Sequence, residues 1–165
     1  MSTNLVLKHT LRFIVLVLLQ VLIFNNIRFL GYVNPLIYIW FIISFPTGVN
    51  RSLTLLVAFL MGGVIDIFSN TPGMYAFATV FVAFARKDLL QLFVPKDMYA
   101  NYEPSVKVLG LPIFLKYVTC MVIVLHLLLF TLEAFSFQHY WLVLLKTAIN
   151  SVVTILLVLS TQKFK

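Results

Sequence analysis

The sequence predicts an all-α, polytopic integral membrane protein with six transmembrane helices in a single domain. First, 62% of the 165 residues are hydrophobic, only 10% are charged, and the mean hydropathy is +1.04, whereas soluble proteins carry about 25% charged residues. Second, most apolar runs approach the roughly 20 residues that a helix needs to cross a bilayer. Third, the basic residues gather in alternate connections, which is typical of cytoplasmic loops.

Residues 5–24 form the first predicted span. Lys8 and Arg12 lie near its start, and apolar sequence resumes soon after Asn25 and Asn26. A cleaved secretory signal would end in a small-residue cleavage site instead. We therefore expect an uncleaved first transmembrane helix.

Residues 35–50 form the second and shortest predicted span. The apolar stretch between Pro35 and Pro46 is about half a normal span, and stretches of that length are often re-entrant or interfacial. Pro35 suits the first turn of a helix, however, and we expect Pro46 to kink the helix without ending it. A helix over 35–50 would be roughly 24 Å long, which suffices where the bilayer thins locally.

Residues 51–68 form the third predicted span, and its small residues predict close packing. Ala58, Gly62 and Asp66 recur at intervals of four, which places them on one helical face. Small residues at this spacing let a second helix approach closely. The partner that we expect is the next span in the chain.

Residues 72–85 form that fourth span, reached through a short turn that contains Gly73. We expect the charged triplet Arg86, Lys87 and Asp88 to end the helix. Residues 86–110 then form the longest polar segment, which we interpret as a cytoplasmic loop that begins with an interfacial helix.

Residues 111–132 and 141–161 form the fifth and sixth predicted spans. His126 lies past the middle of the fifth, where a neutral, hydrogen-bonded core histidine is expected. The sixth carries polar side chains at helical spacing, which we interpret as contacts to other helices or to a partner: Thr147, Asn150, Ser151 and Thr154.

The distribution of charge indicates the orientation. With a cytoplasmic amino terminus, only Arg28 and Lys146 face outward, and such a bias is typical of inner-membrane proteins. The count also favours a crossing by residues 35–50, because Arg86 and Lys87 would otherwise lie outside. Both termini are then cytoplasmic. The basic residues placed inside are Lys8, Arg12, Arg51, Arg86, Lys87, Lys96, Lys107, Lys116, Lys163 and Lys165.

Asp66 is the polar residue whose role most affects the functional interpretation. A carboxylate within lipid costs a few kcal/mol, so it usually has a partner, a function or a place near the surface. The orientation places Asp66 near the outer surface and close to water. We expect it to be paired within the turn, with Ser69, Asn70, Thr71 or a backbone N–H group that starts the fourth helix.

The sequence offers little that would support catalysis. Asp66 has no titratable partner for acid–base chemistry, and His9, His126 and His139 lack the spacing of metal ligands. Cys120 is the single cysteine, so neither a disulfide nor a zinc cluster can form from cysteines. We therefore predict no enzyme activity, no metal and no cofactor. The sequence contains no basic run with interleaved aromatic residues, so we predict no binding to nucleic acid.

Residues 58–76 read Ala-Phe-Leu-Met-Gly-Gly-Val-Ile-Asp-Ile-Phe-Ser-Asn-Thr-Pro-Gly-Met-Tyr-Ala. This stretch resembles the hairpin of the bacterial rod shape-determining protein MreD family, which typically has a Gly, an Asp four residues later, and a Gly after a short turn. Those residues are Gly62, Asp66 and Gly73, and Gly63 lies within the same motif. The resemblance extends to the length, the number of spans and the Leu-Gln-Val-Leu-Ile-Phe-Asn stretch at 19–25.

The resemblance implies a non-enzymatic scaffold of the cell-elongation machinery in the bacterial inner membrane. Such a protein binds the single-span protein MreC and acts indirectly with MreB, RodA and a class B penicillin-binding protein. The family's fold is similar to that of the substrate-binding subunits of energy-coupling-factor transporters, so a vitamin-binding transporter subunit is the alternative. Such subunits dock through small residues on the first helix, and residues 11–24 contain no Ala, Gly or Ser.

Overall fold

The computed structural model describes residues 3–26, 34–94, 101–134 and 140–162, and this part of the chain is helical, without strands. Four of its helical stretches are long and apolar enough to cross a membrane, namely Val6–Phe24, Arg51–Ser69, Leu111–Ala134 and Tyr140–Gln162. The described elements are α1 (Thr3–Leu19), the π-helix η1 (Gln20–Phe24) that continues it, α2 (Ile39–Ser44), α3 (Arg51–Ser69), α4 (Met74–Phe93), α5 (Val106–Leu109), α6 (Leu111–Ala134) and α7 (Tyr140–Gln162).

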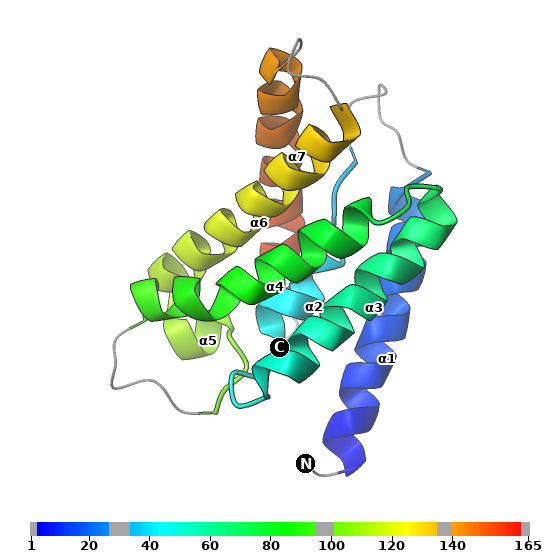
Figure 1. Cartoon of the computed structure of the whole chain (residues 1–165). Coiled ribbons are helices and arrows are strands. Elements are labelled where there is room, and N and C mark those ends of the chain that lie inside the picture. The colour runs from blue at the N-terminus through cyan, green and yellow to red at the C-terminus, as the bar shows by residue number, and fades with distance from the viewer. Residues whose placement is uncertain (1–2, 27–33, 95–100, 135–139, 163–165) are drawn as a thin grey trace.

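The helices pack around α2, and the pairs α3–α4, α4–α6 and α6–α7 are antiparallel neighbours. Figure 1 shows α3 and α4 side by side, joined by a tight turn at the upper right, while α6 and α7 meet near the top of the view. α4 also packs against α6, and the short α2 contacts α1, α4 and α6. Because α2 is covered from several sides, its Trp40 is partly buried and its other four apolar side chains are at most 3% exposed: Ile39, Phe41, Ile42 and Ile43.

The two ends of the bundle differ in chemistry. We call the end that holds the α3–α4 turn, with Asp66, the turn end. We call the opposite end, with Arg51 at the start of α3 and Arg86 in the last turns of α4, the basic end. α6 begins at the basic end, since Tyr117 in its second turn accepts a hydrogen bond from Arg86.

The expected helix over residues 35–50 is not formed. Only Ile39–Ser44 is helical, and Phe45 is extended, with φ −64° and ψ 143°. Pro46 explains the break, because its ring disfavours helical geometry in the residue before it. The segment is nevertheless part of the core and not a surface loop, since every side chain from Pro35 to Ile39 is buried.

The fourth helix is longer than expected. α4 runs from Met74 to Phe93 and passes through Arg86, Lys87 and Asp88, so the expectation that these charges end it at residue 85 is wrong. Arg and Lys are good helix formers, and Arg86 points inward, where it is 6% exposed. The interfacial helix expected at the start of residues 86–110 is therefore the continuation of α4.

The other predicted bounds agree closely with the structure. α3, α6 and α7 each begin and end within two residues of the predicted spans, and α1 with η1 ends at Phe24 as expected. In the predicted loop 86–110, residues 95–100 lie outside the described residues, and the short helix α5 leads directly towards α6.

Candidate functional site

At Gly62 the backbone of α4 packs directly against α3. A Cβ atom added there would lie 2.6 Å from the Tyr75 carbonyl oxygen and 2.6 Å from the Ala76 Cα. Both are backbone atoms of α4, so only glycine fits without moving a helix. Ala58, one turn earlier on α3, is fully buried. Gly63, in contrast, has no such neighbour within 4 Å among the described residues and takes no part in the contact.

Asp66 connects α3 to the start of α4. Its Oδ1 accepts hydrogen bonds from the Tyr75 N–H (2.9 Å) and the Thr71 hydroxyl (3.0 Å), and its Oδ2 accepts one from the Ala76 N–H (2.8 Å). The first N–H groups of a helix lack partners within the helix and attract negative charge. The residue before α4 is Gly73, at φ 84°, which has no side chain to supply a cap. Asp66 therefore caps α4 from the neighbouring helix.

The expectation that Asp66 lies close to water is wrong, while its expected partners are largely correct. The residue is 6% exposed, and three charge-assisted hydrogen bonds offset the cost of burial. Thr71 and the start of the fourth helix were both expected as partners. Because both carboxylate oxygens are occupied by groups that hold the turn together, the geometry gives Asp66 a structural role.

The polar side chains of α7 face inward, onto the irregular segment before α2. Thr147, Asn150, Ser151 and Thr154 are all buried. The Asn34 N–H donates to Asn150 Oδ1 (2.5 Å), and the Leu36 N–H donates to Thr154 Oγ1 (3.1 Å). Irregular backbone at membrane depth needs such partners, because lipid offers none.

Gln20 and His126 complete this network. Gln20 Nε2 donates to the Pro35 carbonyl (3.2 Å), while the two ring nitrogens of His126 lie 2.9 Å from the Val122 carbonyl and 3.4 Å from Thr154 Oγ1. The α7 stripe thus makes contacts within the chain. The hydroxyls of Thr147 and Ser151 have no hydrogen-bond partner among the described residues.

Arg86 has a structural role that the sequence does not predict. Its Nη2 donates to the Phe45 carbonyl, its Nε donates to the Tyr117 hydroxyl (3.2 Å), and that hydroxyl donates to the Ile43 carbonyl (3.3 Å). Carbonyls at the end of a helix lack partners and attract positive charge. Arg86 and Tyr117 therefore cap the end of α2. The largely apolar residues 89–93, which follow the charged triplet, are the signal that the helix continues past Arg86.

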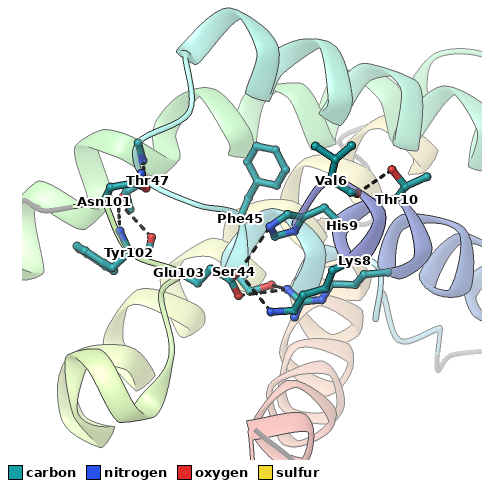
Figure 2. Close-up of polar contacts among 12 residues, drawn as sticks. Val6, Lys8, His9, Thr10, Ser44, Phe45, Thr47, Asn101, Tyr102 and Glu103 are labelled. Atoms are coloured by element: carbon teal, nitrogen blue, oxygen red, sulfur yellow. Dashed lines mark hydrogen bonds and ion pairs between the residues drawn. The ribbon is translucent and has the colours of Figure 1, made fainter. Parts of the chain in front are cut away.

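Glu103 contacts three basic side chains of α1 at the basic end. It lies 3.6 Å from Lys8 Nζ, 3.5 Å from His9 Nε2 and 3.9 Å from Arg12 Nη1. Figure 2 shows this cluster close to Ser44, whose hydroxyl accepts a hydrogen bond from Arg12 (2.9 Å). The contacts tie the chain before α5 to α1 and to the end of α2.

A second set of contacts holds the same segment. The Thr47 N–H donates to the Tyr102 carbonyl (2.9 Å), and the Tyr102 N–H donates to Thr47 Oγ1 (3.1 Å). The Gly48 N–H donates to Asn101 Oδ1 (3.2 Å), and Figure 2 shows Asn101 and Tyr102 beside Thr47. The chain after α2 is therefore fastened to the chain before α5.

A polar cavity of about 370 Å³ lies at the turn end, next to the Asp66 cap. Asn34 contributes an amide oxygen that is buried without a hydrogen-bond partner among the described residues. Such a cavity has the size of a small-molecule site. Its polar lining consists of Asn25, Asn26, Asn34, Ser69, Thr71, Tyr75 and Glu133.

Within the described ranges, no three His, Cys, Asp or Glu side chains gather where they could hold a metal ion. Comparison of the chain with family models, with curated proteins and with solved structures gives no match. The resemblance to MreD therefore rests on the residues of the sequence.

Proposed function

We propose that this chain is a non-enzymatic membrane scaffold of the bacterial cell-elongation machinery. It would cross the inner membrane six times with both termini in the cytoplasm, bind an MreC-like single-span protein, and act indirectly with MreB, RodA and a class B penicillin-binding protein. The basic end would face the cytoplasm and the turn end the outside.

The observation that carries the proposal is that the three residues of the resemblance act together in one structural unit. Gly62 admits α4, Asp66 caps it, and Gly73 supplies the turn conformation at φ 84°. Asn150 and Thr154 of the α7 stripe, and Arg86, likewise form hydrogen bonds within the chain. A fold whose polar groups hold its own helices together suits a scaffold, which needs a fixed shape more than a reactive centre.

The contacts of residues 34–50 support a crossing by this short segment. Asn34 donates to Asn150 and lines the cavity at the turn end, whereas Thr47 and Gly48 bind the 101–102 segment at the basic end. Extended residues rise about 3.3 Å each, against about 1.5 Å in a helix. A partly unwound segment therefore covers more depth than a helix of the same length.

Crosslinking in native membranes tests the proposal. Photoreactive side chains at exposed positions of α1 and α7, such as Leu11 (61% exposed) and Leu156 (59% exposed), should capture a single-span MreC-like protein. Phe59 on α3, which is 56% exposed, is the matched position on another helix. Capture of a transporter ATPase pair, without any MreC-like protein, would refute the scaffold.

The polar cavity at the turn end favours one alternative, a small-solute binding subunit of an energy-coupling-factor-type transporter. Its lining offers amides and hydroxyls, and Asn34 Oδ1 is a buried acceptor without a partner among the described residues. Native mass spectrometry of the purified protein separates the two functions. A vitamin-like adduct that disappears with Asn34→Leu would support the transporter subunit, and adduct-free protein would support the scaffold.

A further inference from the structure

A cleft of about 240 Å³ opens at the basic end, away from the polar cavity and from the residues of the resemblance. The start of α3 and the last turns of α4 form two of its walls, and the 47–49 and 101–102 segments form the others. Three cationic side chains line it, namely Arg51, Arg86 and Lys87, together with the amide side chains of Gln91 and Asn101.

The cleft carries positive charge that the protein only partly compensates. Among the residues that the structure describes, its lining contains no carboxylate. Arg86 is 6% exposed, and both of its hydrogen-bond acceptors are neutral, the Phe45 carbonyl and the Tyr117 hydroxyl. Among the described residues, neither Arg86 nor Lys87 has a carboxylate within 4.0 Å, and Arg51 has only Asp88 at 3.8 Å. A buried charge without a counter-ion is costly, so an anion bound in the cleft would stabilise it.

Arg51 is already oriented for such an anion. Its guanidinium carbon lies 3.9 Å from the centre of the Phe84 ring, and its Nη2 donates to the Phe84 carbonyl (3.1 Å). A guanidinium fixed by stacking loses little freedom on binding. The side chain remains 43% exposed, so donors are still accessible for a ligand.

The surroundings of the cleft favour a group at the surface of a bilayer. Exposed apolar side chains flank it on α3 and α4, including Leu53 (46% exposed), Phe84 (51%) and Leu92 (73%). Basic pockets between helices on the cytoplasmic side of a membrane commonly bind lipid headgroups. The volume of about 240 Å³ also suits a headgroup better than a larger molecule.

We propose that this cleft binds a phosphate group, with Arg51 and Lys87 contacting the phosphate oxygens above the buried charge of Arg86. An anionic phospholipid of the cytoplasmic leaflet is the favoured source, and a soluble phosphate compound would share the same chemistry. The inference rests on the orientation given in the proposed function, but it does not require a scaffold role.

The test uses the full chain purified in detergent. Native mass spectrometry measures retention of phosphatidylglycerol, with phosphatidylcholine as the zwitterionic comparison. Arg51→Gln and Lys87→Gln are made singly and together, while Arg86 stays in place because it caps α2. The matched control is the double variant Lys107→Gln and Lys116→Gln, which removes two exposed cations outside the cleft.

Each cleft substitution should weaken phosphatidylglycerol binding about fivefold, and the double substitution about 25-fold, since a cation near an anionic surface contributes about that factor. The control pair should change binding less than twofold. A parallel titration with inorganic phosphate identifies the source: binding of free phosphate that is lost in the cleft variants, without lipid retention, would assign the site to a soluble compound.

An equal loss of phosphatidylglycerol binding in the cleft and control double variants would indicate general attraction to a basic surface and would overturn the proposal. Unchanged phosphatidylglycerol binding in both double variants would also overturn it. Recovery of an MreC-like partner is measured on the same variants. Loss of that partner in every preparation, with selective lipid binding intact, would overturn the scaffold and leave the phosphate site standing.

Discussion

Asp66 and Arg86 are both charged side chains that are 6% exposed, and each completes the end of a helix other than its own. The carboxylate caps the N–H groups that begin α4, and the guanidinium caps a carbonyl at the end of α2. Each sign is the one that the helix dipole favours. Opposite ends of the bundle therefore solve the same problem, the unpaired backbone of a helix terminus in an apolar setting.

The two caps differ in how far apart their partners lie in the sequence. Asp66 binds N–H groups nine and ten residues away, across a tight turn. Arg86 binds groups on Phe45 and Tyr117, which lie 41 and 31 residues away. The first cap can form as soon as one hairpin forms, whereas the second needs three separate segments to be in place. Arg86 also lacks a counter-ion among the described residues, and the phosphate proposal follows from that difference.

The largest effect is expected at Gly62, where the α3–α4 hairpin leaves no room for a side chain. Gly62→Leu should destabilise the protein by about 3 kcal/mol or more, because the added atoms meet the backbone of α4, which cannot yield as a side chain can. Thermal unfolding followed by size-exclusion chromatography in detergent measures the loss. Gly63→Leu is the matched control and should unfold near the wild-type temperature; an equal loss in both variants would remove the packing role of Gly62.

Arg86→Gln tests the long-range cap. The substitution removes donors from the Phe45 carbonyl and the Tyr117 hydroxyl, and a lost hydrogen bond to a charged group costs about 2 kcal/mol. The neighbouring Lys87→Gln, at an exposed position, should cost little. In a double-mutant cycle, Arg86→Gln and Tyr117→Phe should be non-additive by about 0.5 kcal/mol or more. Strict additivity would show that the two side chains do not act as one cap.

Asp66→Asn tests the local cap, and the expected cost is smaller, about 1 kcal/mol. An amide oxygen can still accept from one N–H group of α4, but the amide nitrogen cannot accept from the other. Function in cells should be largely retained. Asp88→Asn serves as the control, because the Asp88 side chain is 65% exposed. Complete loss of function in a stably inserted Asp66→Asn protein would instead point to a chemical role for the carboxylate.

The contrast between the caps also explains what the sequence could predict. The bounds of α3, α6 and α7 follow from local apolar runs, and the Asp66 cap follows from residues within one hairpin. The end of α2 at Ser44 depends on whether Pro46 kinks or ends the helix, and its sequence is compatible with both. Arg86 can act as a cap only if α2 ends near Ser44, so its role depends on the same choice. The sequence alone therefore places Arg86, a buried cation, at the start of a cytoplasmic loop.

The α7 stripe illustrates the same limit. Its helical spacing predicts one polar face that contacts other helices or a partner, and all four side chains are buried. What they bind could not be predicted, because the partners of Asn150 and Thr154 are backbone N–H groups of Asn34 and Leu36. Residues 34–36 lie before the start of α2, so these N–H groups have no partner within a helix. The irregular segment supplies the N–H groups that the stripe binds, and the stripe supplies the acceptors that this segment needs.

Glu103→Gln should have the smallest effect and separates a surface ion cluster from a buried cap at the same end of the bundle. Glu103 lies within 4.0 Å of Lys8, His9 and Arg12, but its side chain is 21% exposed, so water and salt screen the attraction. Its loss should cost about 0.5 kcal/mol, and the difference from wild type should shrink as salt is added. The cost of Arg86→Gln should hardly change with salt, because its partners are buried and neutral. If both variants respond to salt alike, Arg86 acts as one more surface charge and does not cap α2.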